Sequence, residues 1–264
     1  MEDEYYRNVI RSVVPHKRLG QNFLVKRYVA VAEADHCIGK RVVELGAGLG
    51  ILTEELCKVA KSVTAIEIDR NLFRILSEKI KHKNCNLINS DFFDLDPKSI
   101  KADTLASNVP YNLSSKTLMW LLEQRMPAIL CLQKEFVNRM VASVGSENYS
   151  RLSVFCSLQF DVSKGMDVPA DCFYPMPKVD SSLVQLRPKK SKITKEEMGI
   201  LSLIMEHKNK KVRNAIEDSS KALGISKQEI RALYEKMEQG NQRVSKLTPK
   251  DLLDVAREVI SGLK

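Results

Sequence analysis

The sequence predicts an α/β fold, with helices on both faces of a mostly parallel sheet, followed by a small all-helical C-terminal domain. Between residues 41 and 132, short apolar runs alternate with segments of helical spacing, which is typical of βαβ units around a parallel sheet. Two later β-rich runs, 152–160 and 181–186, favour an antiparallel hairpin at the end of that sheet. Beyond this hairpin the apolar spacing is only helical, so we predict two domains, residues 1–188 and 189–264.

The individual elements follow from apolar periodicity, turn residues and helix caps. Thr194 and Thr248 each precede a helical pattern and have an acidic residue three positions later, which predicts capped helix starts. Because ligands of open α/β sheets bind beyond the carboxyl ends of the strands, polar residues just after each strand are candidates for a site. We predict strands at 41–45, 62–68, 86–89, 104–106 and 128–132, and helices at 25–35, 51–60, 70–81, 113–123, 195–206, 210–223, 227–238 and 249–261.

Composition limits the possible functions. With 264 residues, of which 44% are hydrophobic, the chain can bury a sizeable core. Its formal net charge is +9, and residues 189–264 hold 17 basic against 11 acidic side chains. This charge is typical of a protein whose partner is a nucleic acid.

Cysteine usage and the apolar segments point to a cytoplasmic protein. The six cysteines are scattered and lack metal-ligand spacing, so we expect reduced thiols and no bound metal. The acidic start, Met-Glu-Asp-Glu, is not followed by an apolar segment, and no apolar stretch approaches the roughly 20 residues of a membrane helix. We therefore expect no signal peptide and no membrane partner. Without a coiled-coil pattern, a monomer is expected.

A glycine-rich turn follows the first predicted strand. The run ELGAGLG, residues 44–50, places Gly46, Gly48 and Gly50 at alternate positions, which allows a tight turn and a close approach to a ligand at a helix N-terminus. The next strand ends at Glu67, whose carboxylate can accept hydrogen bonds from both ribose hydroxyls of a nucleoside. Ile51 stands where a dinucleotide-binding GxGxxG has its third glycine. The pattern therefore favours S-adenosylmethionine over a pyrophosphate cofactor; the alternative is a tight turn without a ligand.

Asp91 and Phe92 come directly after another predicted strand. The Asp91 carboxylate can accept a hydrogen bond from the adenine amine of the cofactor, while Phe92 covers the ring. An aspartate in this position is, however, commonly a turn former or a helix N-cap.

The most specific motif is NVPY, residues 108–111. An adenine amine is a poor nucleophile because its lone pair is delocalised into the ring. The side-chain oxygen of Asn108 and the main-chain oxygen of Pro110 can each accept one N–H of this amine, which localises the lone pair and directs it at a methyl donor. Tyr111 offers a face on which an extracted base can stack. The alternative is a proline turn with a buried tyrosine.

A proline-rich segment and two basic clusters complete the candidate residues. In FYPMPKVDS, residues 173–181, two prolines favour a rigid extended loop, and Phe173 can form the second half of a base sandwich with Tyr111. The alternative for this segment is an ordinary strand connector. Basic runs contact phosphates whatever the base sequence, although such runs are commonly solvated faces. The candidate RNA-binding residues are Lys17, Arg18, Lys208, Lys210, Lys211 and Arg213.

Together these motifs resemble the KsgA family of ribosomal RNA adenine dimethyltransferases. RLGQNFL (18–24), ELGAGLG, the strand ending at Glu67, Asp91-Phe92, NVPY, LQKE (132–135) and FYPMPKVDS follow one another in the family's order. The resemblance covers residues 16–190 closely and the helical tail in type, and the run HKNKKVRNAI is nearer to archaeal members. Val109 is a small departure, since leucine is usual there.

The resemblance implies a Rossmann-like class I methyltransferase domain with a seven-stranded sheet. It also implies that S-adenosylmethionine is the cofactor, and that the family's enzymes dimethylate two adjacent adenosines near the 3′ end of small-subunit rRNA, late in subunit assembly. Small-subunit rRNA and the pre-small ribosomal subunit are the expected partners. The adenine is expected to contact Asn108, Pro110, Tyr111 and Phe173, and the cofactor Asn22, Leu24, Gly46, Gly48, Glu67, Ile68, Asp91, Phe92 and Asn108.

Three alternatives remain. Large-subunit rRNA adenine methyltransferases of the antibiotic-resistance type share the cofactor motifs and Asn-x-Pro-Tyr, but the helical tail and FYPMPKVDS favour the small-subunit enzymes. A ribosome assembly factor with secondary catalysis would use the basic tail equally well, although the intact Asn108 and Tyr111 favour catalysis. A Rossmann dehydrogenase is disfavoured by Ile51 and by the lack of a hydride-transfer acid or base near the strand ends.

Overall fold

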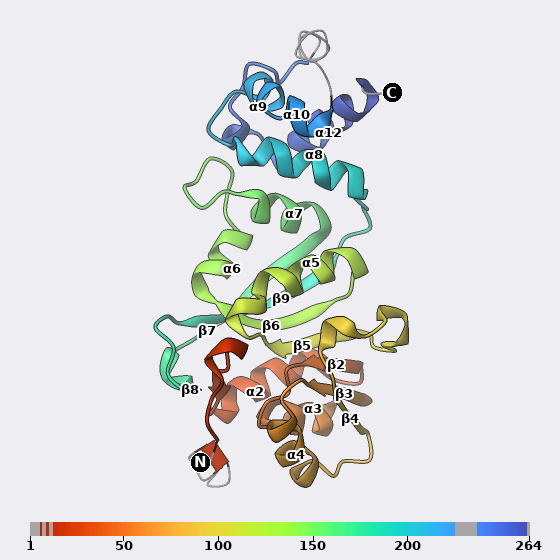
Figure 1. Cartoon of the computed structure of the whole chain (residues 1–264), viewed down its shortest axis with the longest axis vertical. Coiled ribbons are helices and arrows are strands. Elements are labelled where there is room, and N and C mark those ends of the chain that lie inside the picture. The colour runs from red at the N-terminus through yellow and green to blue at the C-terminus, as the bar shows by residue number, and fades with distance from the viewer. Residues whose placement is uncertain (1–5, 7–8, 11–12, 225–236, 263–264) are drawn as a thin grey trace. The chain divides into compact units, whose positions relative to one another are not determined.

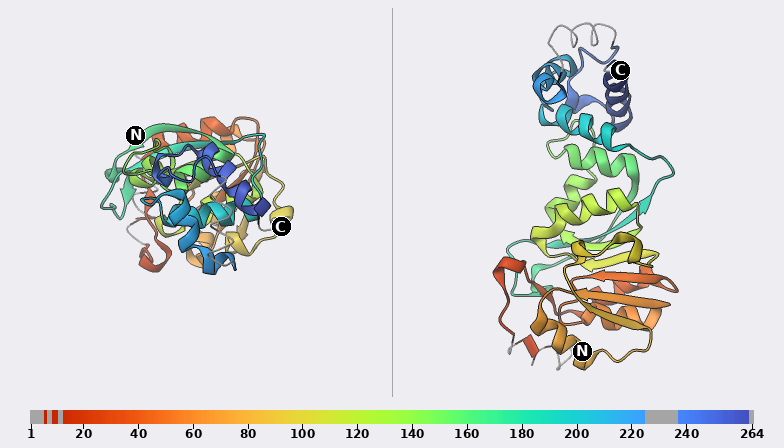
Figure 2. Two further views of the ribbon diagram at one scale, coloured as in Figure 1. Left: turned by 90° about the horizontal axis from the view of Figure 1, so that it is seen from above. Right: turned by 45° about the vertical axis from the view of Figure 1, so that its right-hand side comes forward.

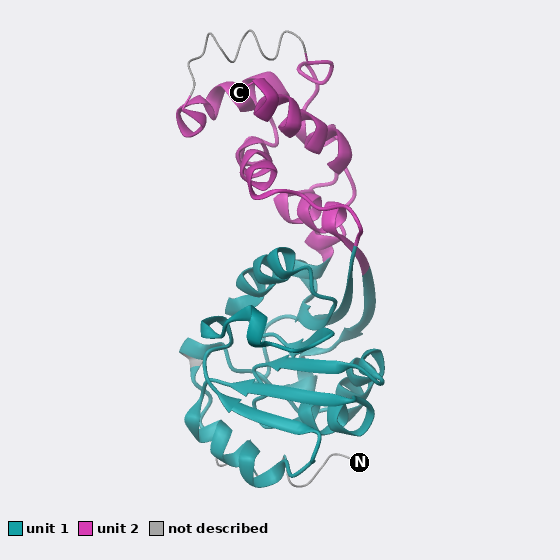
Figure 3. Cartoon of the chain, turned by 90° about the vertical axis from the view of Figure 1, so that its right-hand side faces the viewer, with its two compact units in different colours: residues 1–137, 163–188 teal, residues 138–162, 189–264 magenta. Residues whose placement is uncertain are grey.

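A computed structural model of the chain describes residues 6, 9–10, 13–224 and 237–262 (Figure 1). The chain divides into two compact units, residues 1–137 with 163–188 and residues 138–162 with 189–264 (Figure 3). Sequence analysis placed one boundary after residue 188, whereas the chain passes between the units at two further points. The assignment of separate functions to two domains stays a prediction.

The first unit is built on a seven-stranded sheet with the order β4-β3-β2-β5-β6-β9-β7. Strands β2 to β6 are parallel, and β9 runs antiparallel to β6, so the predicted fold class is confirmed. The central strands β2, β5 and β6 are almost wholly buried, and the short apolar runs within them allow their positions to be predicted. The strands are β2 (Arg41–Leu45), β3 (Ser62–Glu67), β4 (Cys85–Asn89), β5 (Thr104–Asn108), β6 (Ala128–Gln133), β7 (Phe160–Val168) and β9 (Ser181–Pro188).

Helices cover both faces of this sheet (Figure 2). Asp69 caps α4 by accepting hydrogen bonds from the N–H groups of Asn71 and Leu72. Gly50 precedes α3 with a φ of 86°, and a Cβ atom there would lie 2.5 Å from Cδ1 of Leu76, so only glycine lets α3 and α4 approach this closely. The helices of this unit are α2 (Arg27–Ala34), α3 (Ile51–Val59), α4 (Arg70–Lys79) and α5 (Ser114–Gln124), and α6 (Lys134–Met140) follows β6 across the boundary between the units.

One predicted β-run is wrong. Residues 152–160 were expected to be extended, but α7 spans Arg151–Gln159 and the strand β7 begins only at Phe160. A short apolar run has the same composition in a buried helix and in a buried strand, so periodicity does not separate the two. The helix is started by a capping box in which the side chains of Ser150 and Ser153 satisfy each other's main-chain N–H groups.

A two-stranded ladder outside the main sheet was not predicted. In it β1 (Phe23–Leu24) pairs antiparallel with β8 (Phe173–Tyr174), with Phe23 opposite Tyr174 and Leu24 opposite Phe173. Two-residue strands carry no period of their own, and 148 positions separate the partners Leu24 and Phe173 along the chain. This ladder joins the N-terminal segment to the proline-rich segment.

The second unit is helical. Capping boxes at Thr194 and Thr248 begin two of its helices, as predicted. The helix expected over 210–223 is divided into two near Ser219, and the one expected over 227–238 lies almost wholly outside the described residues. The helices α8 (Lys195–Glu206), α9 (Val212–Asp218), α10 (Ser220–Leu223) and α12 (Pro249–Gly262) pack with α7 around buried apolar side chains.

Two further observations concern cysteines and membranes. All six cysteines are unpaired thiols, as expected, and five of them are buried. Among the described residues, no helix combines the length and the apolar character that crossing a membrane requires.

Candidate active site

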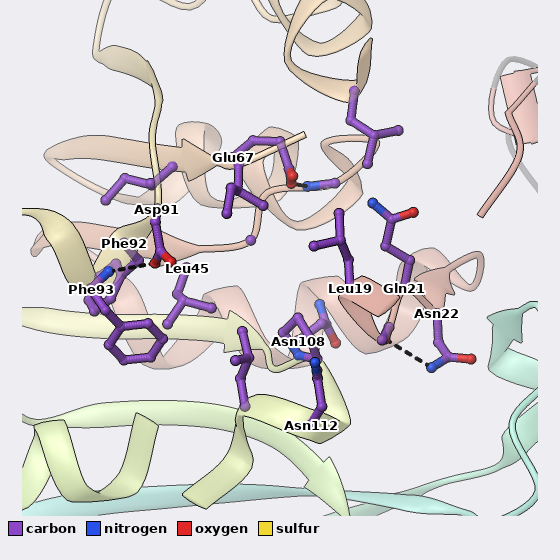
Figure 4. Close-up of a pocket in the computed structure, with 18 of the residues that line it drawn as sticks. Leu19, Gln21, Asn22, Leu45, Glu67, Asp91, Phe92, Phe93, Asn108 and Asn112 are labelled. Carbon is purple, nitrogen blue, oxygen red and sulfur yellow. Dashed lines mark hydrogen bonds between the residues drawn. The ribbon is translucent and has the colours of Figure 1, made fainter. Parts of the chain in front are cut away.

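The main pocket lies at the carboxyl ends of β2, β3 and β5 (Figure 4). The strand order reverses between β2 and β5, and such a switch point is the usual ligand site of an open α/β sheet. The pocket encloses about 870 Å³, part of it open to solvent. The predicted site residues that line it are Asn22, Gly46, Gly48, Glu67, Ile68, Asp91, Phe92, Asn108 and Pro110.

Glu67 is held rigidly at one side of this pocket. Its two carboxylate oxygens accept hydrogen bonds from the main-chain N–H groups of Gly48, at 2.7 Å, and Asp69, at 2.8 Å. The side chain is only 4% exposed, and burial raises the pKa of the carboxyl while the two N–H groups partly offset this. Each oxygen keeps a second lone pair, so the carboxylate can accept two further donors from a ligand.

Asp91 caps a short helix and also lines the main pocket. Its carboxylate accepts the N–H of Phe93 at 2.9 Å and so caps the short helix η3 (Phe92–Asp94), yet the residue also lines the pocket. Phe92 is buried beside it, with its ring edge-to-face against Trp120 at 4.9 Å. The aromatic wall of the pocket is thus fixed by packing.

A segment that we name the N-terminal strap, residues 16–24, forms another wall. Gly20 has a φ of 65°, and a Cβ atom there would lie 2.4 Å from Oδ1 of Asn112. Asn112 donates to the main-chain oxygen of Arg18 at 3.4 Å, and Gln21 donates to the carboxylate of Asp69 at 3.1 Å. Sequence analysis assigned only Asn22 and Leu24 of this strap to the site. A glycine followed by two amide side chains in RLGQNFL was the available signal for Gly20 and Gln21.

The predicted catalytic residues meet in a second, smaller pocket of about 230 Å³. Asn108 lines both pockets, and its Oδ1 is buried and has no hydrogen-bond partner among the described residues. Such an acceptor is costly until a donor pairs with it. The smaller pocket is lined by Gly20, Asn22, Asn108, Val109, Pro110, Tyr111, Cys131 and Phe173.

The two aromatic residues of this smaller pocket are fixed by separate contacts. The hydroxyl groups of Tyr111 and Ser181 form a hydrogen bond of 2.8 Å, and Ser114 donates to the main-chain oxygen of Tyr111 at 2.9 Å. Burial raises the pKa of Tyr111, which therefore stays a neutral phenol. Phe173 is carried to the pocket by the pairing of β8 with β1. The NVPY and FYPMPKVDS motifs thus meet, and Ser181 is a positioning residue that sequence analysis missed.

A third cavity extends from the glycine-rich turn behind the strap. Leu24, predicted as a cofactor residue, lines it and not the main pocket. Glu44, which sequence analysis left without a role, also lines it, together with Asn22, Gly46 and Asn108. Within the described residues, no group of three or more His, Cys, Asp or Glu side chains could hold a metal ion.

The chain can now be compared with known proteins. A family profile described as Ribosomal RNA adenine dimethylase matches residues 14–261. The chain belongs to this family. The family expected from the motifs is therefore confirmed, and with it an rRNA adenine dimethyltransferase rather than a dehydrogenase.

Relatives of this dimethylase span most of its length. It is 35% identical over 246 residues to the probable ribosomal RNA small subunit methyltransferase A of Pyrococcus abyssi, covering 91% of this chain and 90% of that one. Among solved structures, a dimethyladenosine transferase from Plasmodium falciparum matches with a TM-score of 0.78 at 27% identity, covering 91% of this chain and 98% of that chain. The 23S rRNA methyltransferase ErmE, with a TM-score of 0.66 at 24% identity and coverage of 90% and 100%, shares the fold.

The predicted RNA-binding residues of the dimethylase have different surroundings. Lys208 donates to the main-chain oxygens of Glu147 and Tyr149, at 3.1 and 2.9 Å, so its ammonium ties two parts of the second unit together. Lys210 forms an ion pair with Asp218.

The other four predicted RNA-binding residues differ in exposure and location. Lys211 is exposed and Arg213 is half-buried. In the first unit, Lys17 and Arg18 lie in the short helix η1 (Lys17–Leu19), and Arg18 is exposed. A role in RNA binding stays a prediction for all six.

Proposed function

We propose that the chain uses S-adenosylmethionine to dimethylate two adjacent adenosines near the 3′ end of small-subunit ribosomal RNA. The observation that carries the proposal is Oδ1 of Asn108, a buried acceptor without a partner among the described residues, on the wall common to two pockets. One pocket has the residues that a nucleoside cofactor needs, and the other is narrow and aromatic. The proposed setting is the cytoplasm, where a monomer would act on the pre-small subunit.

The residues of the main pocket fit the proposed cofactor. The free lone pairs of Glu67 suit the two ribose hydroxyls, and Asp91 has a carboxylate oxygen left for the adenine amine. Phe92 and Ile68 supply apolar surface for the adenine ring. Gly46 and Gly48 at the turn allow a close approach of the main chain.

The smaller pocket would hold the target adenine for attack. Oδ1 of Asn108 and the main-chain oxygen of Pro110 accept the two N–H groups of the amine, and this localises its lone pair. The Pro110 oxygen would use its second lone pair, because it already accepts the N–H of Leu113 at 2.8 Å. Tyr111 and Phe173 stack on the extracted base. When bound, the cofactor supplies an electrophilic methyl group. The methylated amine would then release one proton to water. A single N–H remains after this, which either acceptor can hold, so the same residues can position the amine for the second transfer.

The proposed reaction is tested by methyl transfer from labelled S-adenosylmethionine to under-methylated small ribosomal subunits, followed by separation of the nucleosides. Label in dimethyladenosine, at two adjacent positions, supports the proposal. Label on naked large-subunit rRNA alone would favour the antibiotic-resistance type of enzyme. Binding of subunits without any label would leave only a role in ribosome assembly.

Replacing Glu67 with glutamine is expected to weaken binding of S-adenosylhomocysteine about tenfold, measured by calorimetry. The amide keeps the shape of the side chain but loses the charge-assisted hydrogen bonds to the ribose, which are worth about 1.5–3 kcal/mol. Glu78→Gln, an exposed change on α4, serves as the control. Unchanged affinity in the Glu67 variant would place the ribose elsewhere.

The paired change Lys211→Ala with Arg213→Ala is expected to lower the affinity for small subunits and to reduce the slope of log affinity against log salt by about one per lost phosphate contact. Lys208→Ala should instead lower the unfolding midpoint, since Lys208 holds the main chain at Glu147 and Tyr149. Filter binding over a salt series measures the slopes, with Lys98→Ala as the matched loss of an exposed charge. An unaltered slope in the paired variant would remove both residues from the RNA interface.

A further inference from the structure

An exposed apolar patch lies beside the smaller pocket and has no role in the function described so far. We name Tyr28, Tyr174 and Met176 the rim patch; their side chains are 51%, 44% and 68% exposed. The hydroxyl of Tyr28 lies 3.1 Å from Sγ of Cys172, and the N–H of Val25 donates to the main-chain oxygen of Cys172 at 2.8 Å. The start of α2 and Cys172 are therefore neighbours, and Tyr174 and Met176 follow Cys172 closely along the chain.

The rim patch adjoins the base pocket through β8. Phe173 and Tyr174 are consecutive residues of one strand, so their side chains point to opposite faces. Phe173 is 6% exposed and lines the smaller pocket, while Tyr174 presents its ring to solvent. The two aromatic rings thus belong to positions only about 3.8 Å apart along the main chain. Because these two side chains point to opposite faces of β8, a nucleotide linked to a base held against Phe173 would reach the Tyr174 ring by passing around this short strand.

Charges of both signs lie around the rim patch, since the exposed Asp171 and Asp180 accompany its lysines in sequence and Asp180 accepts the main-chain N–H of Ala170. Lys178 is exposed, follows Met176 by two positions and has no acidic side chain within ion-pair distance among the described residues. Lys26 precedes Tyr28 by two positions, near the start of α2. Exposed aromatic rings flanked by lysines are the features on which single-stranded bases stack while cations contact the phosphates.

We propose that Tyr174 is a stacking platform for the base of the nucleotide that flanks the target adenosine, with Lys178 on the intervening phosphate. The inference rests on the proposed function, because the flanking nucleotide is defined by an adenine in the smaller pocket. An extracted adenosine leaves its neighbour unstacked on one side, and an exposed ring replaces the lost stacking partner. Tyr174 would thereby favour single-stranded targets, in which this neighbour is free to move onto it.

The test uses small subunits reassembled with rRNA that carries an abasic residue on either side of the target adenosine. For intact RNA, Tyr174→Ala is expected to raise KM about tenfold and to change kcat little, since stacking on one ring is a binding contribution. Tyr174→Phe should restore KM, because it keeps the ring. With the abasic residue at the stacking position, wild type should show the same rise in KM, and Tyr174→Ala should add nothing to it.

Controls separate the possible failures. Met119→Ala removes an apolar side chain of equal exposure on α5, and should leave KM unaltered. A loss of S-adenosylhomocysteine affinity in Tyr174→Ala would show that the residue only supports the ladder with β1, and would overturn the proposal. A rise in KM that is the same on intact and on both abasic substrates would assign the rim patch to a ribosomal protein. If wild type methylates subunits and Tyr174→Ala has the same KM and kcat, Tyr174 is not a stacking platform. The proposed function is unaffected by that result.

Discussion

Replacement of Asn108 with alanine is expected to reduce kcat for methyl transfer to small subunits by about 10²–10³-fold. In the transition state the attacking amine gains positive charge, and a fixed acceptor on its N–H is worth most at that moment, as for donors that face a developing oxyanion. The buried Oδ1 of Asn108 is such an acceptor, already desolvated and without a competing partner among the described residues. Pro110 would remain as the second acceptor, so residual activity is expected.

Single-turnover kinetics with labelled cofactor measures this effect. Because Asn108 also lines the main pocket, the affinity for S-adenosylhomocysteine is measured in the same variant. Asn214→Ala, an exposed change on α9, is the matched control. A variant with normal kcat and a raised KM would show that Asn108 binds the adenine without contributing to the transition state.

The free energy of unfolding is expected to fall by several kcal/mol as pH rises from about 5 to above 8. Glu33 of α2 and Glu44 of β2 are both buried. Neither oxygen of the Glu33 carboxylate has a partner with good hydrogen-bond geometry among the described residues, and the main-chain N–H of Ser107 lowers its pKa by less than burial and Glu44 raise it. Burial raises the pKa of both carboxyls, that of Glu44 to about 8, and the charge of Glu44 adds to the rise at Glu33. Thr53 donates to Glu44 at 2.7 Å and partly offsets this.

The direction of the change follows from proton linkage. In the unfolded chain the pKa of these carboxyls lies near its ordinary value of 4.5, so between that pH and the folded pKa the folded state binds more protons. The stability that the two protonated carboxyls contribute to the fold is fully present below the unfolded pKa, and it is lost as pH rises through the folded pKa. Each pKa unit of difference between the folded and the unfolded state changes the free energy of unfolding by about 1.4 kcal/mol. The exposed Asp103 and Asp167 have lowered pKa values and contribute only below this range.

Glu33→Met isolates one member of this buried pair. A thioether of similar length needs no hydrogen bond, and removal of an unpartnered buried carboxyl is expected to raise the free energy of unfolding at pH 8 by about 1–4 kcal/mol. The variant should also show a flatter pH dependence. Urea unfolding at several pH values measures both, with the exposed Glu78→Met as reference. A less stable variant at pH 8 would mean that Glu33 is stabilised by a partner inside the fold.

The parts of the fold that could be predicted from the sequence are those with a local signal. Strands β2 and β6 have a clear signal because most of their residues are apolar and buried within the sheet, and the turn at Gly46 follows directly from its glycines. The helix α7 was mistaken for a strand because its short apolar run lacks a polar face. Its start depends on Ser150 and Ser153, whose capping role is visible only once the helix exists.

Most residues of the candidate site could be predicted from the sequence, but the contacts that bring them together could not. NVPY and FYPMPKVDS could each be assigned to adenine, yet the bond between Tyr111 and Ser181 joins positions 70 residues apart and has no local signal. Position 20 needs glycine because its φ is 65° and because Asn112, which lies far along the sequence, occupies the space that a Cβ atom would take. Lys208 was assigned to RNA from its charge alone, whereas its ammonium is held by main-chain oxygens of a distant loop.

The ladder between β1 and β8 contributes residues to both pockets. Phe23 on one strand lines the main pocket, and Phe173 on the other lines the smaller one, while the strands are paired residue by residue. A ligand that shifts either strand displaces its partner as well. Any resulting change in affinity must be equal in both directions, because thermodynamic linkage is reciprocal. With the cofactor and the target adenosine in these pockets as proposed, the binding of each is expected to alter the affinity for the other through the same four residues.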